Sequence, residues 1–153
     1  MAISKSTVIT GIWENIYDRL NSGVTSVTLS DSSTSTIQIY TGAFPDSEID
    51  TKTSYPILVV NSPNLSWEDF TLTKKDVIGT FAIDIYTTKA ESADLFLDAI
   101  IASIEAYRGT LSNTYRVTKV NLESTDSAQE MRGKMKIHMR SCTFGFKYKF
   151  TKT

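Results

Sequence analysis

Hydrophobic residues near the N-terminus recur at helical spacing between about Ser6 and Asn21. They form one apolar stripe, which consists of Val8, Ile9, Ile12, Trp13, Ile16, Tyr17 and Leu20. Such a stripe predicts an amphipathic helix that packs on a sheet, with Trp13 and Tyr17 in the core or in an interface. Ser4 or Ser6 is expected to cap its start, and Asn21-Ser22-Gly23 to end it.

The segment that follows is rich in serine and threonine and predicts short strands separated by turns. The alternation over Val24–Leu29 indicates one strand, Asp31-Ser32-Ser33 a turn, and Ile37–Tyr40 a second strand. Residues 41–54 are polar and carry the acidic residues Asp46, Glu48 and Asp50. They predict a long connecting loop, and ordered loops of this length commonly contact partners.

Tyr55–Val60 is the clearest strand in the sequence, because its continuous aliphatic and β-branched residues indicate burial on both faces. An irregular strand-like pattern over Leu65–Leu72 precedes a predicted turn at Lys74-Lys75-Asp76. Strict alternation over Phe81–Tyr86 then predicts a second strong strand.

A second helix is predicted from about Lys89 to Arg108. Thr88-Lys89-Ala90-Glu91 matches a capping box, in which the threonine and the glutamate satisfy free amides at the helix start. The apolar face consists of Leu95, Phe96, Ala99, Ile100, Ile104 and Tyr107. Gly109 stands where a left-handed cap would end this helix.

Two strands are predicted near the C-terminus, Val117–Leu122 with Thr118, Val120 and Leu122 on one face, and a long one from about Arg132 to Lys149. Glu123–Met131 is predicted to be a polar loop between them. In the long strand, Met135, Ile137 and Met139 share one parity, whereas Phe144, Phe146, Tyr148 and Phe150 share the other. This change of parity predicts a bulge or bend between Arg140 and Gly145.

The order of elements predicts one α+β domain over residues 1–153, with two helices packed on one face of a mainly antiparallel sheet and a long, bent C-terminal strand. Apolar residues make up 41% of the 153 residues, and the net charge of −1 gives no global attraction to nucleic acid or to an anionic membrane. No segment has the run of about 20 apolar residues that is needed to span a bilayer. The N-terminus has no secretory pattern, so we expect assembly in a reducing cytoplasm.

Candidate chemistry is sparse. His138 and Cys142 are the only histidine and the only cysteine, and they share a parity on the predicted long strand. No acidic residue lies within five positions of His138 to orient it, so a nucleophilic pair is not expected. One histidine and one cysteine do not complete a zinc site, and the seven glycines form no phosphate-binding loop. The sequence predicts no enzyme, metal site or cofactor.

Two charge patterns are candidates for a subunit interface. The second helix carries acidic residues on its expected solvent side, Glu91, Asp94, Asp98 and Glu105. Cations alternate along the long strand, Lys134, Lys136, His138 and Arg140. Both patterns fit solvated faces opposite the core. Alternatively, the acidic helix face of one subunit packs against the basic strand face of the next, or the basic stripe makes weak phosphate contacts with DNA.

The layout resembles the tail-terminator, or tail-completion, proteins of long-tailed bacteriophages, which include the minor tail protein U type. The resemblance rests on the N-terminal helix, the Tyr55–Val60 strand, the Phe81–Tyr86 strand before a capped helix, and the long final strand. It implies a virion protein of the tail or neck that forms a hexameric ring, caps the tail tube, stops its polymerisation and docks to the filled head. The partners implied are further copies of the chain, the tail tube protein and head–tail connector proteins, with DNA passing through the ring.

Contacts with the tube or connector are expected in the two predicted polar loops. Their acidic residues are Asp46, Glu48 and Asp50 in the first, and Glu123, Asp126 and Glu130 in the second. Two other functions stay open: a different neck component, such as a head-closure or connector protein, and a small-ligand-binding domain. The latter would require a cavity of several hundred cubic ångströms with convergent polar groups.

Overall fold

The computed structural model of the chain describes residues 7–41, 55–69, 74–132 and 134–151. Its helices are α1 (Val8–Gly23) and α2 (Ala90–Tyr115). Its strands are β1 (Ser26–Thr28), β2 (Thr34–Thr36), β3 (Gln38–Thr41), β4 (Ile57–Val60), β5 (Asn64–Asp69), β6 (Lys74–Thr87), β7 (Val117–Arg132) and β8 (Met135–Thr151).

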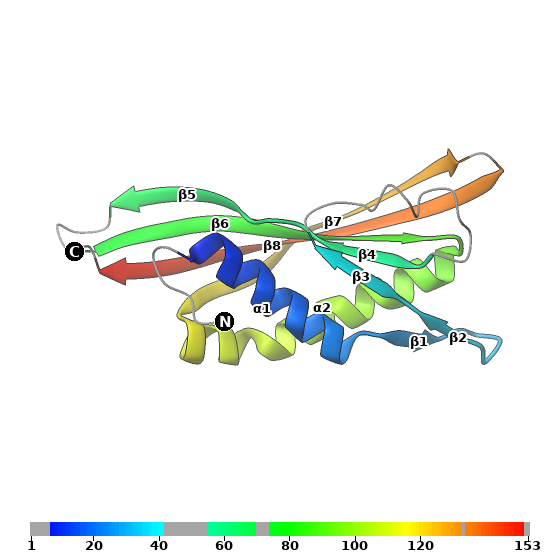
Figure 1. The fold of residues 1–153 in the computed structure, drawn as a ribbon, viewed down its shortest axis with the longest axis horizontal. Coiled ribbons are helices and arrows are strands. Elements are labelled where there is room, and N and C mark those ends of the chain that lie inside the picture. The colour runs from blue at the N-terminus through cyan, green and yellow to red at the C-terminus, as the bar shows by residue number, and fades with distance from the viewer. Residues whose placement is uncertain (1–6, 42–54, 70–73, 133, 152–153) are drawn as a thin grey trace.

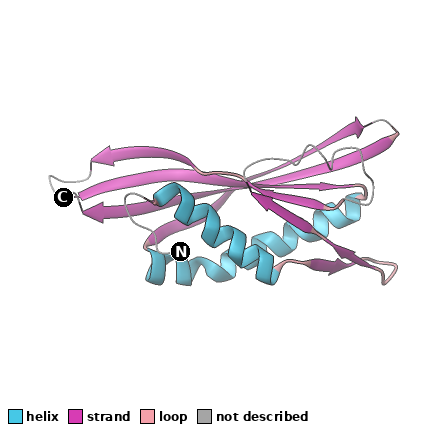
Figure 2. Cartoon of the chain, in the orientation of Figure 1, coloured by secondary structure: helices cyan, strands magenta, loops and turns pink. Residues whose placement is uncertain are grey.

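Six strands form one sheet in the order β3-β4-β6-β8-β7, and β5 pairs with β6 beyond the end of β4. Only β3 and β4 run parallel, and the other pairs in this sheet are antiparallel. Strands β1 and β2 form a separate hairpin. Both helices lie on one side of the sheet, which we call the helix face, and the opposite side is the outer face (Figures 1 and 2). The predicted α+β class is confirmed.

Helix α1 buries most of the predicted stripe against α2 and the sheet, but Ile9 of the stripe is 47% exposed. Ile12, Ile16 and Leu20 are at most 2% exposed. The N-cap is Thr7, which makes no side-chain capping bond, and the expected caps Ser4 and Ser6 lie outside the described residues. The helix ends at Gly23, as predicted, where the amide of Val24 donates to the carbonyl of Leu20 at 2.8 Å.

Helix α2 differs from its prediction at both ends. The capping box is wrong, because the N-cap is Lys89 without a side-chain bond, and the Thr87 hydroxyl donates to the Lys89 carbonyl at 2.6 Å. The predicted end at Gly109 is also wrong. The helix continues to Tyr115, and Arg116 adopts the left-handed conformation with φ of 59°. Burial of Leu111, which is 2% exposed, offsets the entropic cost of a glycine within the helix.

Strand β6 begins earlier than the sequence predicts. Lys74-Lys75-Asp76 is not a turn, because all three residues pair with β8, and Lys75 and Asp76 also pair with β5. Asp76 is buried, and its Oδ2 lies 3.5 Å from Nζ of Lys147. Pairing on both sides therefore overrides the turn propensity of this polar segment.

Strand β7 replaces the predicted loop over Glu123–Met131. Residues 124–132 pair in regular antiparallel register with residues 143–135 of β8. Both faces of β7 are exposed from Asn121 to Gln129, so this segment shows no apolar periodicity. The prediction that Thr118, Val120 and Leu122 share one face is also wrong. Lys119 has a φ of 54°, and the register between β7 and β8 shifts at this point. As a result Val117 and Val120 are buried, whereas Leu122 is 37% exposed.

Strand β8 has no bulge between Arg140 and Gly145. It pairs with β6 in unbroken register from Lys74↔Thr151 to Thr87↔His138, and the extra residues that shift the β7–β8 register belong to β7. The change of parity has another cause, which is that the sheet has apolar clusters on both faces. Ile137 packs on the outer face with Tyr55, Ile57 and Val59, whereas Phe144, Phe146 and Tyr148 join the core under the helices.

Candidate subunit interface

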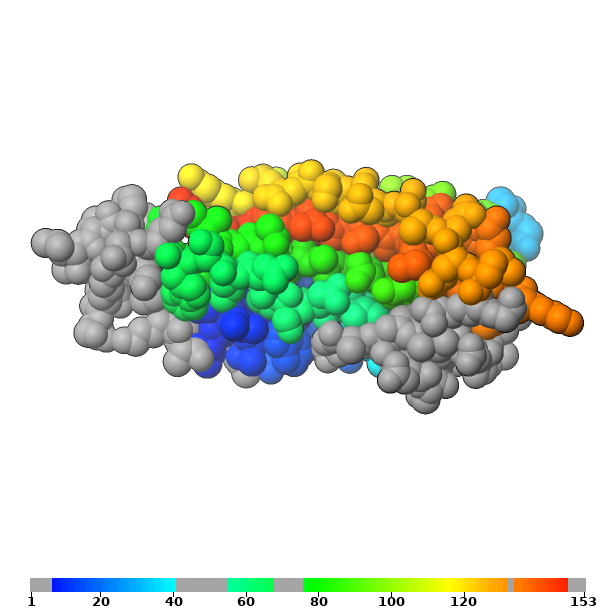
Figure 3. Space-filling model, turned by 90° about the horizontal axis from the view of Figure 1, so that it is seen from above, coloured from blue at the N-terminus to red at the C-terminus, as the bar shows by residue number. Residues whose placement is uncertain are grey.

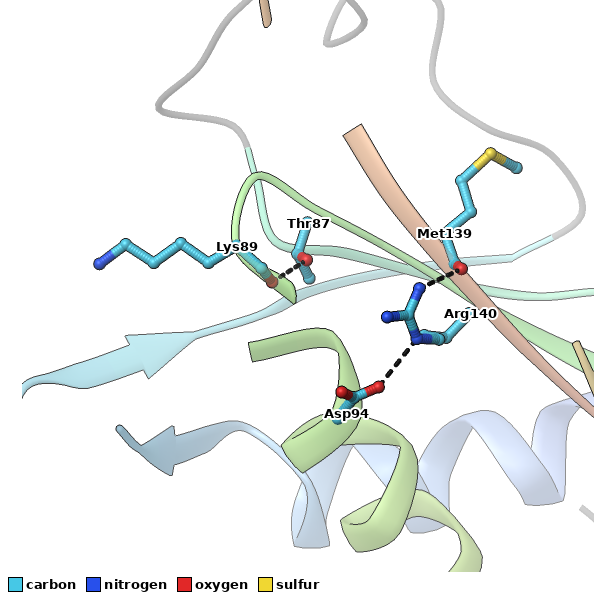
Figure 4. Close-up of polar contacts among 5 residues, drawn as sticks. All are labelled: Thr87, Lys89, Asp94, Met139 and Arg140. Carbon is cyan, nitrogen blue, oxygen red and sulfur yellow. Dashed lines mark hydrogen bonds and ion pairs between the residues drawn. The ribbon is translucent and has the colours of Figure 1, made fainter. Parts of the chain in front are cut away.

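Arg140 and Asp94 join the two predicted charge patterns within one chain (Figure 4). Nε of Arg140 lies 2.8 Å from Oδ1 of Asp94, and Nη1 of Arg140 donates to the carbonyl of Met139 at 3.0 Å. The pair connects β8 to the start of α2. One cation and one carboxylate that the sequence assigned to contacts between subunits are therefore partnered inside the protomer.

Two further acidic residues of α2 also have partners within the chain. Glu105 forms an ion pair with Arg108 at 2.9 Å, and Glu91 accepts hydrogen bonds from the amide and the hydroxyl of Ser30. The Glu91 contact ties the β1–β2 hairpin to the first turn of α2. Asp98 is exposed, and it has no ion pair with any described residue.

The basic residues of β8 lie on the helix face and not opposite the core as predicted. Lys136, His138 and Arg140 have the same parity as the core residues Cys142 and Phe144 in an unbroken strand. Lys134 and Lys136 are exposed, whereas His138 is half-buried and its Nδ1 is buried without a hydrogen bond to any described residue. Lys134 and Lys136 are the members of this stripe that stay available to a partner.

His138 and Cys142 are not arranged for nucleophilic catalysis. They lie four positions apart on β8, a separation of about 13 Å along the strand. Burial, assisted by the negative charge of Asp84, raises the pKa of the Cys142 thiol to about 12, so the thiolate is scarce at neutral pH. Within the described ranges, no three histidine, cysteine or acidic side chains are grouped to hold a metal ion.

Two cavities bounded by described residues have volumes of about 170 and 180 Å³. The first lies beside Asp84, Tyr86, Asp126 and Met139, and the second lies between the β1–β2 hairpin and the start of α2. Both are smaller than the roughly 300–1,000 Å³ of typical small-molecule sites. Neither supports the small-ligand-binding alternative.

The lateral edges of the sheet carry features that the sequence did not reveal. Strand β7 forms one edge, while β3 and β5 lie on the other side of the sheet. Figure 3 shows β7, in yellow and orange, along one long rim of the molecule. Among the described residues, the exposed large hydrophobic ones are Ile9, Trp67, Leu122 and Met131, at 47%, 44%, 37% and 63% exposure. Periodicity could not identify the last three, because the pairing of β5 and β7 decides their positions.

The predicted partner-contact residues fall into two groups. Asp46, Glu48 and Asp50 lie outside the described residues. Glu123, Asp126 and Glu130 lie on β7, where Glu123 and Asp126 are exposed and Glu130 is half-buried. They therefore belong to a sheet edge instead of a loop.

Comparison with known proteins relates the chain to others by structure. No protein-family model and no curated protein matches the sequence. Among solved structures, the chain is similar to a chain in the "Virion of native gene transfer agent (GTA) particle", with a TM-score of 0.53 and 11% identity. The match covers 94% of this chain and 98% of that chain. In the described part of the chain, no helix has the length and apolarity needed to cross a membrane. The protein thus shares a whole-chain fold with a component of a GTA virion.

Proposed function

We propose that this protein is a structural, non-enzymatic component of a phage-like virion and acts as its tail terminator. The observation that carries the virion assignment is the likeness to a chain of a GTA virion over nearly the full length of both chains. The terminator role rests on the resemblance of the layout to tail-terminator proteins. Coverage of 94% of this chain and 98% of that chain means that the match is not limited to a common substructure.

In this function the chain forms a ring of identical subunits that caps the tail tube, ends its polymerisation and offers a docking surface to the head. The ring has no catalytic turnover, and its specificity comes from shape, symmetry and charge at the contacts. The exposed cations Lys134 and Lys136 and the acidic residues Glu123 and Asp126 supply charges for contacts with further copies, the tail tube protein or connector proteins. DNA passing through such a ring would need no sequence-specific contact.

The test is an assembly assay with purified protein. Light scattering measures the oligomeric mass, electron microscopy shows the shape, and growing tail tubes are incubated with the protein to measure their length. A closed ring, hexameric by the resemblance, that binds one end of the tubes and shortens them is the expected result. A protein that stays monomeric at all concentrations, with or without tubes, contradicts the proposal. A ring that binds the portal complex but leaves tube growth unchanged identifies a different neck component.

A further inference from the structure

We propose that the β5 edge of one copy docks on the β7 edge of a second copy, so that the sheet continues from subunit to subunit. This inference rests on the proposed ring, because it names the two surfaces through which the ring closes. The first surface, called the Trp67 edge, consists of β5 and the first turn of α1. The second surface, called the Leu122 edge, consists of β7.

The Leu122 edge has the properties of a docking strand. Strand β7 pairs with β8 on one side, and no described strand pairs with its other side. Residues 124–132 contain no register shift, and the run from Val120 to Met131 contains neither lysine nor proline. Natural edge strands are commonly protected from pairing by those residues or by bulges. This regular segment lacks all three.

The Trp67 edge offers a second edge strand with an exposed aromatic residue. Strand β5 pairs with β6, and no described strand lies along its other side. Trp67 is opposite Val77 and therefore points to the helix face. The first turn of α1, which carries Ile9, lies beneath β5 in Figure 1 and beside it in Figure 3. Trp67 is 44% exposed and Ile9 47% exposed.

The two edges match each other better than either matches itself. Leu122 is opposite Phe144, so it too points to the helix face, and the two apolar anchors lie on the same side of a continued sheet. Pairing of β7 with a second β7 about Ala128, the middle of its regular segment, would place Asp126 opposite Glu130. Like charges in directly opposed positions destabilise a strand pair. This register of a β7–β7 contact is therefore disfavoured, and the proposed contact joins different edges.

A contact between different surfaces on opposite edges repeats head to tail. When the rotation between neighbours permits, such a contact closes into a ring. A partner of another kind would need only one prepared edge, whereas this chain carries two, each with an edge strand and a large exposed apolar residue. The occupant that fits both edges is a second copy of this chain.

Cysteine cross-linking tests the pairing directly. Ser66 of β5 and Ser124 of β7 are both exposed. Each is changed to cysteine, singly and together, and the variants are treated with a flexible bismaleimide. The native Cys142 is 0% exposed, and unmodified protein serves as the background control. We expect no product from either single variant, dimers from a mixture of the two, and a ladder up to the ring size from the double variant. A matched control with Ser112→Cys on α2 and Ser124→Cys gives no ladder.

The outcomes separate this inference from the proposed function. Rings seen by microscopy without cross-linking through positions 66 and 124 overturn the edge pairing and leave the terminator function standing. Self-cross-linking of Ser124→Cys alone also overturns it, because it reveals an interface between like edges. A second variant, Trp67→Ala, is expected to raise the concentration at half-assembly about tenfold or more. A change of less than about twofold, with the circular dichroism spectrum unchanged, contradicts Trp67 as an anchor.

Discussion

Arg140 of β8 and Asp94 of α2 form an ion pair that holds the start of the long helix against the central region of the sheet, with 2.8 Å between Nε and Oδ1. The Arg140 side chain is 14% exposed and the Asp94 side chain 65%. The contact therefore lies at the protein surface and is partly screened by solvent. It removes two of the charges that the sequence offered for contacts between subunits.

Asp94→Asn is expected to lower the free energy of unfolding by about 0.5–1 kcal/mol, because the variant keeps the size of the side chain but loses its charge. The matched control is Asp98→Asn, on the same helix and without an ion pair to any described residue. Urea unfolding measures both variants at low and at high salt. The difference between them should shrink with salt, and equal stabilities at low salt would contradict a contribution from the pair.

Lys134→Glu with Lys136→Glu is expected to weaken assembly and to change its dependence on salt, because both cations are exposed beside the β7–β8 hairpin. The stability of the monomer should change little, since neither side chain is buried. Sedimentation at several salt concentrations measures the assembly. Lys89→Glu, which is exposed at the start of α2 and on neither proposed edge, is the control, and equal behaviour of the two variants would show that the stripe is merely solvated.

Gly109→Ala is expected to stabilise the protein by about 0.5–1 kcal/mol, since alanine favours a helix interior. A methyl group at this position meets nothing within 4 Å. Gly79→Ala should instead cost about 1–3 kcal/mol, because its methyl group would overlap the carbonyl oxygen of Asn64 and lie 2.9 Å from Cζ of Phe146. Thermal unfolding of both variants checks the two signs. Loss of stability in Gly109→Ala would place Gly109 in the left-handed cap that the sequence predicted.

The elements predicted well are those whose own side chains determine their burial. The stripe of α1 and the continuous run of β4 needed no information from other parts of the chain. The four residues of β4 are all at most 2% exposed, as the run predicts. Alternation over Phe81–Tyr86 likewise identified the C-terminal half of β6.

The elements predicted wrongly are those that other segments determine. Glu123–Met131 is polar on both faces, and it forms a strand because β8 supplies the hydrogen bonds of one edge. The apolar parity of β8 changes because β4 and β8 build a second cluster on the outer face, which one strand alone cannot reveal. The charge patterns were recognised, but their alternation could not distinguish a partner in α2 from a partner in a neighbouring subunit. Trp67 was not identified as an exposed residue, because its position depends on the pairing of β5 with β6.

Alkaline pH is expected to destabilise the protein through Cys142. Burial holds the pKa of its thiol at about 12, above the value of 9.0 for a free thiol, so above pH 9 the folded state binds more protons than the unfolded state. The free energy of unfolding therefore falls as pH rises from about 9 toward 12, approaching about 1.4 kcal/mol per pH unit for one proton. Below pH 9 the thiol is protonated in both states and has no effect on the slope.

Cys142→Ala provides the comparison for this pH dependence. The variant is less stable at pH 8 because it loses buried volume, but it lacks the thiol. The gap between the two proteins should narrow as pH rises above 9. Urea unfolding between pH 8 and pH 10 measures this gap in the free energy of unfolding. Burial also raises the pKa of Tyr107 to about 12, and its main contribution falls above this pH range. Parallel profiles would show that the thiol ionises equally in both states.

The unbroken pairing of β8 determines how the molecule responds to mechanical load. Strand β8 is hydrogen-bonded to β6 on one side and to β7 on the other over most of its length, and it contributes side chains to the clusters on both faces. A pull along its axis shears these bonds in parallel, so that many must fail at once, whereas a pull across the sheet would open them one by one. The fold is thus stiff along the strand direction and can transmit tension from one end of the molecule to the other without unfolding between them.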